Sequence, residues 1–182
     1  EDGCVWLFAG SGFARKGLDS ALAALARLRE PSLQLWVAGR DAIGPWQRRA
    51  RALGVADRVH FLGPSDRMPE LYAAADGLLL PTRYDACSNA CLEAAACAKP
   101  VISTRNNGAM EVLADDAVTL DDPEDVAAIA AALHSLADPA SRHALGERAR
   151  KRVEGHDWRA HVRQLRDFYQ RVIEQRSPGE SS

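Results

Sequence analysis

The sequence predicts an α/β fold in which a doubly wound parallel sheet carries helices on both faces and extra helices near its C-terminal end. Short apolar runs alternate with segments of helical periodicity, which is typical of βαβ units in a parallel sheet. The chain has 182 residues, of which 47% are hydrophobic and 26% charged, and this is ordinary for one globular domain with a sizeable core. Because βαβ crossovers are right-handed, the alternation predicts a doubly wound layer.

Six strands and five helices are expected between residues 5 and 120. The apolar runs place strands at 5–9, 33–38, 59–62, 77–80, 101–103 and 118–120. The helical patterns between them lie at 18–28, 46–53, 69–75, 89–98 and 109–113. The run DGLLLP reads as a short buried strand. Helix 89–98 is rich in helix formers and is stopped by Pro100, because proline cannot continue a helix.

Three helices are expected from about residue 122 onward, each opened by an aspartate that caps free N–H groups. The expected starts are Asp122-Pro123, Asp138-Pro139 and Asp157-Trp158. The last helix, 158–174, has an apolar stripe at three- and four-residue spacing, formed by Trp158, Val162, Leu165, Phe168, Tyr169 and Val172. This stripe needs a partner surface, which is either the core of the same domain or another part of the protein. We expect one domain over 1–176 and a disordered polar tail over 177–182.

The charge distribution excludes some classes of partner. A net charge of -2 and a pI near 6.2 give no global attraction to nucleic acid or to anionic lipid. Residues 142–176 hold ten Lys or Arg against five Asp or Glu, so the last helices are basic. A solvated helix face is the ordinary interpretation of such a run, and docking to a membrane surface or to a partner stays open.

The cysteines and the N-terminal residues bear on location. Cys4, Cys87, Cys91 and Cys97 show no C-x-x-C spacing, so a zinc site is not expected. We expect Cys87, Cys91 and Cys97 to pack as small apolar side chains, and reduced thiols fit a cytoplasmic protein. No apolar run approaches the roughly 18 residues of a spanning helix, and the start EDGCVWLF lacks the basic region of a signal peptide. The chain begins without Met, close to its first strand, and is expected to be a piece of a longer protein. The five histidines show no triad or metal spacing, and none is given a catalytic role.

The most informative segment is YDACSNACLEAAACAKP, residues 84–100, in which Asp85 and Glu93 lie eight residues apart across a strand-to-helix junction. The helix that follows points its N-terminus at the end of the strand. Free N–H groups around 88–91 and the helix dipole suit a phosphate, and two nearby carboxylates suit hydroxyl groups. The segment therefore predicts a site for a ligand that carries both a phosphate and sugar hydroxyls.

Other loops should meet this segment, since ligands of doubly wound sheets bind beyond the C-terminal strand ends. AGSGFARKGLD offers Gly12, Arg15 and Lys16, but its spacing is not G-x-G-x-x-G, and taken alone it reads as a structural turn. AGRDAIG offers Gly39 and Arg40, which either contacts a base or phosphate or is a surface residue. Two further loops are the strand end around Leu62, with free backbone groups, and the Asn106-Asn107-Gly108 turn, which we place near the pocket.

The pattern of an acidic residue, seven others and Glu, followed by a small-residue helix and a Pro-Val-Ile strand, resembles the group 1 (family 4) retaining glycosyltransferases. Within them it is most similar to the branch that glucosylates the lipopolysaccharide core. The resemblance covers nearly the whole chain, from FAGSGFARKGLD to the final helix. It implies the C-terminal, donor-binding, Rossmann-like half of a GT-B enzyme, whose N-terminal acceptor half is absent.

The resemblance also implies roles for individual residues. Lys16, in the family's K-G-x-D element, would contact the donor diphosphate, Asp85 the sugar hydroxyls and Glu93 the nucleotide ribose. Amides near Ser88, Asn89 and Ala90 would hold phosphate oxygens, and the strand end at Leu62 would read the base. The sequence departs from the commoner family pattern at position 85, where Asp replaces Glu, and the shorter side chain weakens any inference about the sugar. We take Lys16, Asp85 and Glu93 as the catalytic set.

The expected reaction transfers glucose from UDP-glucose to a heptose of a lipopolysaccharide core without a metal. Lys16 and the helix N-terminus would stabilise the leaving diphosphate, and acceptor groups would come from the missing half. Contact with the inner face of the cytoplasmic membrane is a further expectation. Two alternatives stay open: a non-catalytic flavodoxin-like module that binds a nucleotide or a partner, and half of an epimerase or phosphorylase.

Overall fold

A single parallel sheet of six strands forms the centre of the protein, in a computed structural model that describes residues 3–156 and 158–176. The strand order is β3-β2-β1-β4-β5-β6, and every pairing is parallel. The strands are β1 (Cys4–Ala9), β2 (Leu33–Ala38), β3 (Val59–Gly63), β4 (Gly77–Leu80), β5 (Val101–Thr104) and β6 (Val118–Leu120). All six predicted strands are confirmed within one residue at either end.

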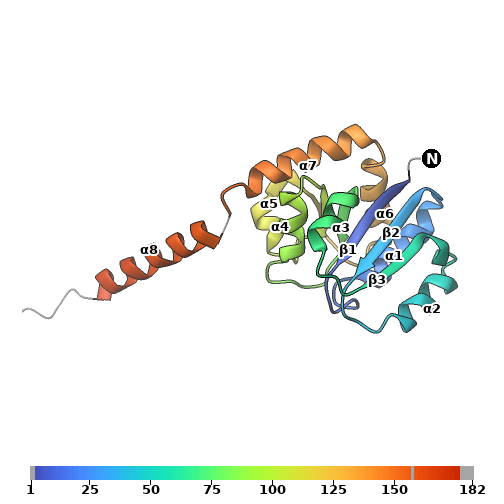
Figure 1. Ribbon diagram of the computed structural model, residues 1–182, viewed down its shortest axis with the longest axis horizontal. Coiled ribbons are helices and arrows are strands. Elements are labelled where there is room, and N and C mark those ends of the chain that lie inside the picture. Colours follow the sequence, from blue (N-terminus) through green and yellow to red (C-terminus); the bar gives the residue numbers. More distant parts are fainter. Residues whose placement is uncertain (1–2, 157, 177–182) are drawn as a thin grey trace, which may run out of the picture.

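Helices cover both faces of this sheet (Figure 1). They are α1 (Leu18–Leu28), α2 (Gly44–Ala52), α3 (Met68–Ala74), α4 (Asn89–Ala96), α5 (Ala109–Leu113), α6 (Val126–Ser135), α7 (Pro139–Val153) and α8 (Trp158–Arg176), with short 3-10 turns at Ala56–Arg58 and Ala114–Asp116. Helix α1 packs against α2 and α6 on one face, and α4 packs against α3, α5 and α7 on the other. The predicted doubly wound α/β fold is confirmed.

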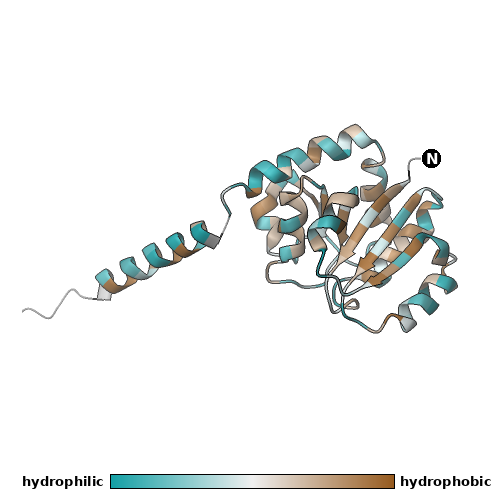
Figure 2. Ribbon diagram, viewed as in Figure 1, coloured by the Kyte–Doolittle hydropathy of each residue, from teal (hydrophilic) through white to brown (hydrophobic). Residues whose placement is uncertain are grey.

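The core lies on both faces of the strands, whose residues are the most apolar part of the molecule (Figure 2). Leu78, Leu79 and Leu80 of β4 are at most 1% exposed, as expected of a strand covered on both sides. The ring of Trp6 packs on Gly77 so closely that a Cβ there would lie 2.6 Å from it. Burial of such side chains is the main source of stability of the sheet.

The strand order determines where a ligand can bind. Strands β2 and β3 follow β1 toward one edge of the sheet. Strand β4 lies on the other side of β1, and β5 and β6 continue from it toward the opposite edge. The loops that leave β1 and β4 therefore diverge to opposite faces of the sheet and open a crevice beyond the C-terminal strand ends. These are the loops that contain Lys16 and Asp85.

Two predictions from the sequence are corrected by the fold. The helix after β6 is capped by Asp125, which accepts a hydrogen bond from Ala128 N at 2.9 Å, and not by Asp122. Asp122 instead accepts from Glu124 N at 2.8 Å and forms a turn before the helix. Helix α4 ends at Ala96 rather than 98, because Ala98 takes a left-handed conformation ahead of Pro100.

The prediction that Cys87, Cys91 and Cys97 pack as small apolar side chains is correct for two of them and wrong for one. Cys91 is fully buried, and Cys4 and Cys97 are partly buried against the core. Cys87 is exposed, because it lies in the loop that precedes α4 rather than on its inner face.

The last helix, α8, extends away from the α/β body (Figure 1). Four residues of the predicted apolar stripe, Val162, Leu165, Phe168 and Tyr169, are between 42% and 57% exposed and do not pack on the core of this domain. Val172, also predicted for the stripe, is partly buried, and its neighbour Ile173 is 60% exposed. The predicted cap Asp157, the side chain of Trp158 and the tail 177–182 lie outside the described residues. None of the helices in the described residues has both the length and the apolar content needed to cross a bilayer.

Candidate functional site

An ion pair joins the two loops that flank the crevice. Lys16 Nζ, after β1, lies 3.0 Å from Asp85 Oδ2, after β4. Both are well covered, since Lys16 is 8% exposed and the Asp85 side chain 15%. Arg15 Nη1 approaches the same carboxylate oxygen at 3.6 Å from a more exposed position. Sequence reasoning assigned Lys16 and Asp85 to different parts of a ligand, and the structure brings them into direct contact.

Glycines allow these loops to approach each other. Gly10 has a φ of +125°, and a Cβ there would lie 2.7 Å from the Lys16 side chain, so the lysine passes directly over this glycine. Gly17 has a φ of +83°, and a Cβ there would lie 2.0 Å from the carbonyl oxygen of Pro81. Arg83 N also donates to the carbonyl oxygen of Arg15 at 2.9 Å. The backbone around Lys16 is therefore fixed against the β4–α4 loop.

A buried asparagine ties a third loop to the site. Asn107, at 0% exposure, accepts hydrogen bonds at Oδ1 from Ser88 N and Ala109 N, both at 3.1 Å. Its Nδ2 donates to Ser103 Oγ at 3.0 Å and to Cys91 Sγ at 3.2 Å. The sequence identified this segment only as a turn, because the four contacts come from residues distant along the chain or on other elements. Asn107 is thus the side chain that anchors the N-terminal end of α4.

The first turn of α4 offers two free donors. The N–H of Ser88, predicted to face a phosphate, is already donated to Asn107. The N–H groups of Asn89 and Ala90 have no hydrogen-bond partner among the residues that the structure describes. The N-terminus of a helix carries partial positive charge, so these two groups suit an anion.

The glycine loop after β1 is closed by a residue that sequence reasoning missed. Asp41, after β2, accepts hydrogen bonds from Gly12 N at 3.1 Å and from Phe13 N. The predicted Gly12 amide is therefore occupied within the protein. The only signal for Asp41 in the sequence is its place directly after Gly39-Arg40, at the end of a predicted strand. Its carboxylate shapes the loop and leaves the side chains of Arg15 and Lys16 as the cationic groups there.

A pocket of about 210 Å³ lies beside this ion pair, at the C-terminal ends of β1, β2 and β3. Among the residues that line it are Gly10, Ser11, Gly39, Arg40, Pro64, Ser65, Met68, Tyr72, Ala90 and Glu93. A Cβ at Gly39 would lie 2.1 Å from the carbonyl oxygen of Gly10, so glycine is required for the two strand ends to meet here. Four predicted site residues, Gly39, Arg40, Ala90 and Glu93, thus line the same pocket.

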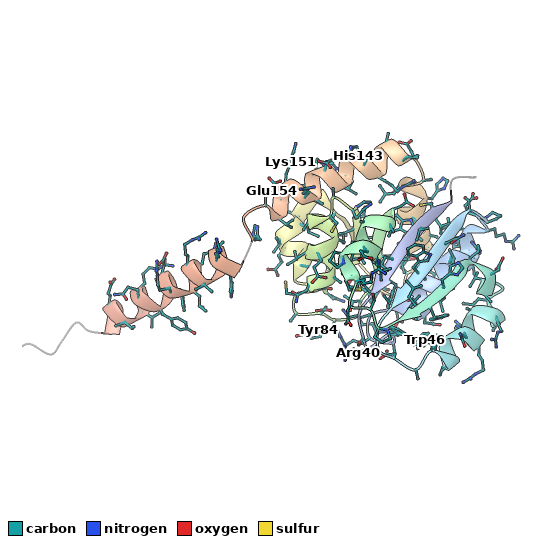
Figure 3. The ribbon with its side chains drawn as sticks, in the orientation of Figure 1. Arg40, Trp46, Tyr84, His143, Lys151 and Glu154 are labelled. Atoms are coloured by element: carbon teal, nitrogen blue, oxygen red, sulfur yellow. The ribbon has the colours of Figure 1, made fainter. Side chains whose placement is uncertain are left out.

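Two other predicted residues line other hollows, one of which also includes Glu93 and so adjoins this pocket. Leu62, which is 41% exposed, lines a separate hollow with residues of α2, because β3 is the edge strand of the sheet. Asn89 lines a hollow between α4 and the start of α8. Whether the backbone at Leu62 reads a base stays a prediction. Figure 3 shows Arg40 and Tyr84, the neighbour of Asp85, at the same end of the sheet.

Glu93 has a partner that the sequence did not reveal. Tyr72 Oη, from α3, donates a hydrogen bond to Glu93 Oε2 at 2.8 Å. Burial, and after it the hydrogen bond to Glu93, raises the pKa of the Tyr72 phenol. Tyr72 is 3% exposed and lines the pocket together with Glu93. Nothing in the spacing of the sequence marks a tyrosine on the preceding helix as part of this site.

The site combines cations and free N–H donors, which suit phosphate oxygens, with carboxylates, which suit hydroxyl groups. Within residues 3–156 and 158–176, no three His, Cys, Asp or Glu side chains are grouped as a metal site would require. These groups suit a ligand that carries both phosphate oxygens and hydroxyl groups.

Comparison with known proteins identifies relatives of similar sequence. A family model described as glycosyl transferases group 1 matches residues 3–138. The lipopolysaccharide glucosyltransferase WaaG of Escherichia coli K12 is 38% identical over 109 residues, which cover 58% of this chain and 29% of WaaG. D-inositol 3-phosphate glycosyltransferase 2 of Catenulispora acidiphila is 33% identical over 195 residues, covering 95% of this chain and 44% of the relative.

Solved structures agree with these relatives. A crystal structure of WaaG, described as a glycosyltransferase of lipopolysaccharide biosynthesis, superposes with a TM-score of 0.79 and 32% identity over 85% of this chain and 43% of that chain. The Anabaena protein HepE, in complex with UDP-glucose, has a TM-score of 0.80 at 20% identity, over 93% of this chain and 49% of its own, which is a likeness of fold alone. The chain spans less than half the length of each of these proteins.

Proposed function

The chain belongs to the glycosyltransferases of group 1, and from this membership we propose that it is the donor-binding half of an enzyme that transfers glucose from UDP-glucose to a glycan acceptor. The family is enzymatic. The choice of UDP-glucose is supported by the lipopolysaccharide glucosyltransferase WaaG, to which the chain is similar, and by the complex of HepE with UDP-glucose.

The observation that carries the proposal is the convergence of Arg15, Lys16 and the α4 N-terminus beside one pocket. Two cationic side chains and the free N–H groups of Asn89 and Ala90 suit a diphosphate. Glu93, in the wall of the pocket, suits the ribose hydroxyls, while Gly39 and Arg40 at the strand ends suit the base. A nucleoside diphosphate linked to a sugar uses all of these groups.

The same groups would act during transfer. As the bond between the sugar and the diphosphate breaks, negative charge grows on the leaving phosphate oxygens. Lys16, Arg15 and the helix N-terminus are fixed in place before this happens, so they stabilise that charge without reorganisation. In this proposal the protein provides no covalent nucleophile, the leaving phosphate helps to take the acceptor proton, and the anomeric configuration is retained. In this proposal no metal is needed, because these cations stabilise the negative charge on the leaving phosphate oxygens.

The acceptor would be bound by a second domain outside this chain, and we propose that α8 packs its exposed apolar stripe on that domain. Val162, Leu165, Phe168 and Tyr169 of α8 are exposed, and the chain spans less than half the length of these relatives. We further propose a cytoplasmic protein that contacts the inner face of the membrane through basic side chains of α7 and α8. Sedimentation with vesicles of anionic and of neutral lipid tests this contact, and equal binding to both would contradict it.

The donor site is tested by titrating the chain with UDP, GDP, ADP and UDP-glucose while main-chain NMR shifts are followed. We expect UDP and UDP-glucose to perturb Lys16, Ala90 and Glu93, and Lys16→Ala to weaken binding at least about tenfold through the lost diphosphate contact. Lys151→Ala, on the exposed surface of α7, is the matched control and should bind as the wild type does.

Two results would contradict the proposal. If no nucleotide perturbs the site, in this chain or in the protein that carries both domains, the donor-binding function is wrong. If nucleotides bind without preference for a sugar nucleotide and the two-domain protein transfers no sugar, a non-catalytic nucleotide-binding module is favoured instead.

A further inference from the structure

Tyr72 and Glu93 come from different helices and meet only through their side chains at the pocket. Tyr72 lies in α3 and is 3% exposed, while Glu93 lies in α4 and is exposed. The phenol donates to Glu93 Oε2 at 2.8 Å. The other carboxylate oxygen, Oε1, has no hydrogen-bond partner among the residues that the structure describes.

We propose that Tyr72 is a positioning residue that fixes the Glu93 carboxylate so that Oε1 accepts hydrogen bonds from the ribose hydroxyls of the donor nucleotide. This inference rests on the proposed function. A glutamate on an exposed helix surface samples many rotamers, and binding a ligand would require it to give up that freedom. The bond from Tyr72 removes most of this freedom before the ligand arrives, so the carboxylate is preorganised.

The surroundings of Tyr72 suit this task. Its ring is held by the core, so the position of the hydroxyl is determined by packing rather than by a flexible side chain. Because its pKa is raised, the phenol stays protonated and remains a donor throughout the neutral pH range. Glu93 is the acceptor that the hydroxyl has in this structure, which also explains why a buried polar group is tolerated at this point.

A purely structural role makes a different prediction. If the bond only satisfies the buried hydroxyl, its loss should lower stability without changing how the site distinguishes one nucleotide from another. If it positions Glu93, its loss should weaken the recognition of ribose specifically. UDP and 2′,3′-dideoxy-UDP carry the same base and diphosphate, so the ratio of their affinities isolates the contribution of the ribose hydroxyls.

The test is calorimetric titration of both nucleotides into the wild type, Tyr72→Phe, Glu93→Gln and the double variant. We expect the wild type to prefer UDP by about tenfold or more, as for hydrogen bonds to a charged acceptor. Tyr72→Phe should reduce this ratio by about threefold to tenfold through weaker UDP binding, with dideoxy-UDP affinity unchanged. When Glu93→Gln is already present, adding Tyr72→Phe should not reduce the ratio of UDP to dideoxy-UDP affinity any further. Both substitutions act on the same contact, between Glu93 and the ribose.

A matched control and a folding measurement accompany the test. Tyr169→Phe removes the same hydroxyl from an exposed position on α8 and should leave both UDP and dideoxy-UDP affinities unchanged. Thermal unfolding of each variant shows whether the fold is retained. If Tyr72→Phe fails to fold, Glu93→Gln, whose side chain is exposed, still reports whether the ribose preference depends on this carboxylate.

The outcomes separate this inference from the proposed function. If the wild type prefers UDP and Tyr72→Phe keeps that preference intact, Tyr72 does not position Glu93, while the donor site stands. If UDP and dideoxy-UDP bind the wild type equally, Glu93 does not contact ribose and the inference is overturned alone. If neither UDP, GDP nor ADP binds even the two-domain protein, the proposed function and the inference both fail.

Discussion

The ammonium group of Lys16 lies 3.0 Å from the Asp85 carboxylate, and both side chains are largely buried beside the crevice. The cation proposed for the diphosphate and the acid proposed for the sugar therefore form an ion pair with each other. Asp85 uses Oδ2 for both Lys16 and Arg15. Its other oxygen, Oδ1, has no hydrogen-bond or ion-pair partner among the residues that the structure describes.

Breaking this pair from one side should destabilise the fold. Lys16→Met leaves the Asp85 carboxylate as a poorly hydrated charge, and Asp85→Asn does the same to the Lys16 ammonium group. Each variant should therefore lower the free energy of unfolding by about 1–3 kcal/mol. The double variant should lose less than the sum of the two, since no unpaired charge remains. Urea unfolding of the four proteins measures this. Additive losses would mean that the two side chains do not interact in solution.

Gly17 should tolerate no side chain. Gly17→Ala places a Cβ 2.0 Å from the carbonyl oxygen of Pro81 at a φ of +83°, so it should lower the free energy of unfolding by at least about 2 kcal/mol. Gly54→Ala is the matched control, since its φ is +70° but nothing lies within 4 Å of the added atom. It should cost about 1 kcal/mol from backbone strain alone. Equal losses in denaturant titrations would show that the two loops are not in close contact.

The Asn107 side chain should both hold the N-terminal end of α4 in place and stabilise the fold. Asn107→Ala removes the acceptor of Ser88 N and leaves that buried donor unsatisfied, so the free energy of unfolding should fall by about 2–3 kcal/mol. Hydrogen exchange of the Ser88 and Ala109 amides should accelerate more than that of the strands. Asn106→Ala, its exposed neighbour, serves as the control. Unchanged protection of Ser88 in Asn107→Ala would refute the anchoring role.

The cysteines should react in a fixed order. Burial raises the pKa of the Cys91 thiol to about 11, so at pH 8 only about one molecule in a thousand carries the reactive thiolate, and that thiolate is also inaccessible. Cys87 is exposed and should be alkylated by iodoacetamide within minutes at pH 8. Peptide mass spectrometry distinguishes the two sites. Rapid labelling of Cys91 in the folded protein would contradict its burial, whereas rapid labelling after addition of denaturant is expected.

Helix α8 should contribute little to the stability of the α/β body. Leu165→Glu with Phe168→Glu changes two exposed side chains, so the melting temperature of the chain should stay within about 2 °C of the wild type. In the two-domain protein the same pair should lower activity. Leu145→Glu, at 7% exposure in α7, should unfold the chain and shows that the assay detects a buried charge. A large loss of stability from the α8 variant would mean that this helix packs on the body.

The fold could be predicted because its signals are local. Each strand is an apolar run between breakers, and each crossover follows from handedness, so the order of elements needs no knowledge of distant contacts. Helix starts are less certain where two candidates compete. Asp122 precedes a proline and resembles a cap. Asp125, however, lies three residues before Ala128, whose N–H group needs an acceptor, and Asp125 is therefore the cap.

The site could be predicted only in outline. Lys16, Asp85 and Glu93 follow from strand ends and from the spacing of the acidic motif. Asp41 and Tyr72 could not be found, because each acts on a residue of another element and its role depends on tertiary placement. Asn107 was visible as a turn but not as an anchor for the same reason.

The hydrogen bonds around the Asn107-Gly108 pair should also slow the chemical ageing of this sequence. Deamidation of such a pair begins when the glycine nitrogen attacks the asparagine carboxamide and closes a succinimide ring. Here Gly108 N donates to the carbonyl oxygen of Asp85 at 3.0 Å, and the carboxamide of Asn107 is held by four hydrogen bonds. Neither group is free to reach the other while the loop is closed. The appearance of aspartate or isoaspartate at position 107 during storage therefore measures how often this end of the sheet opens.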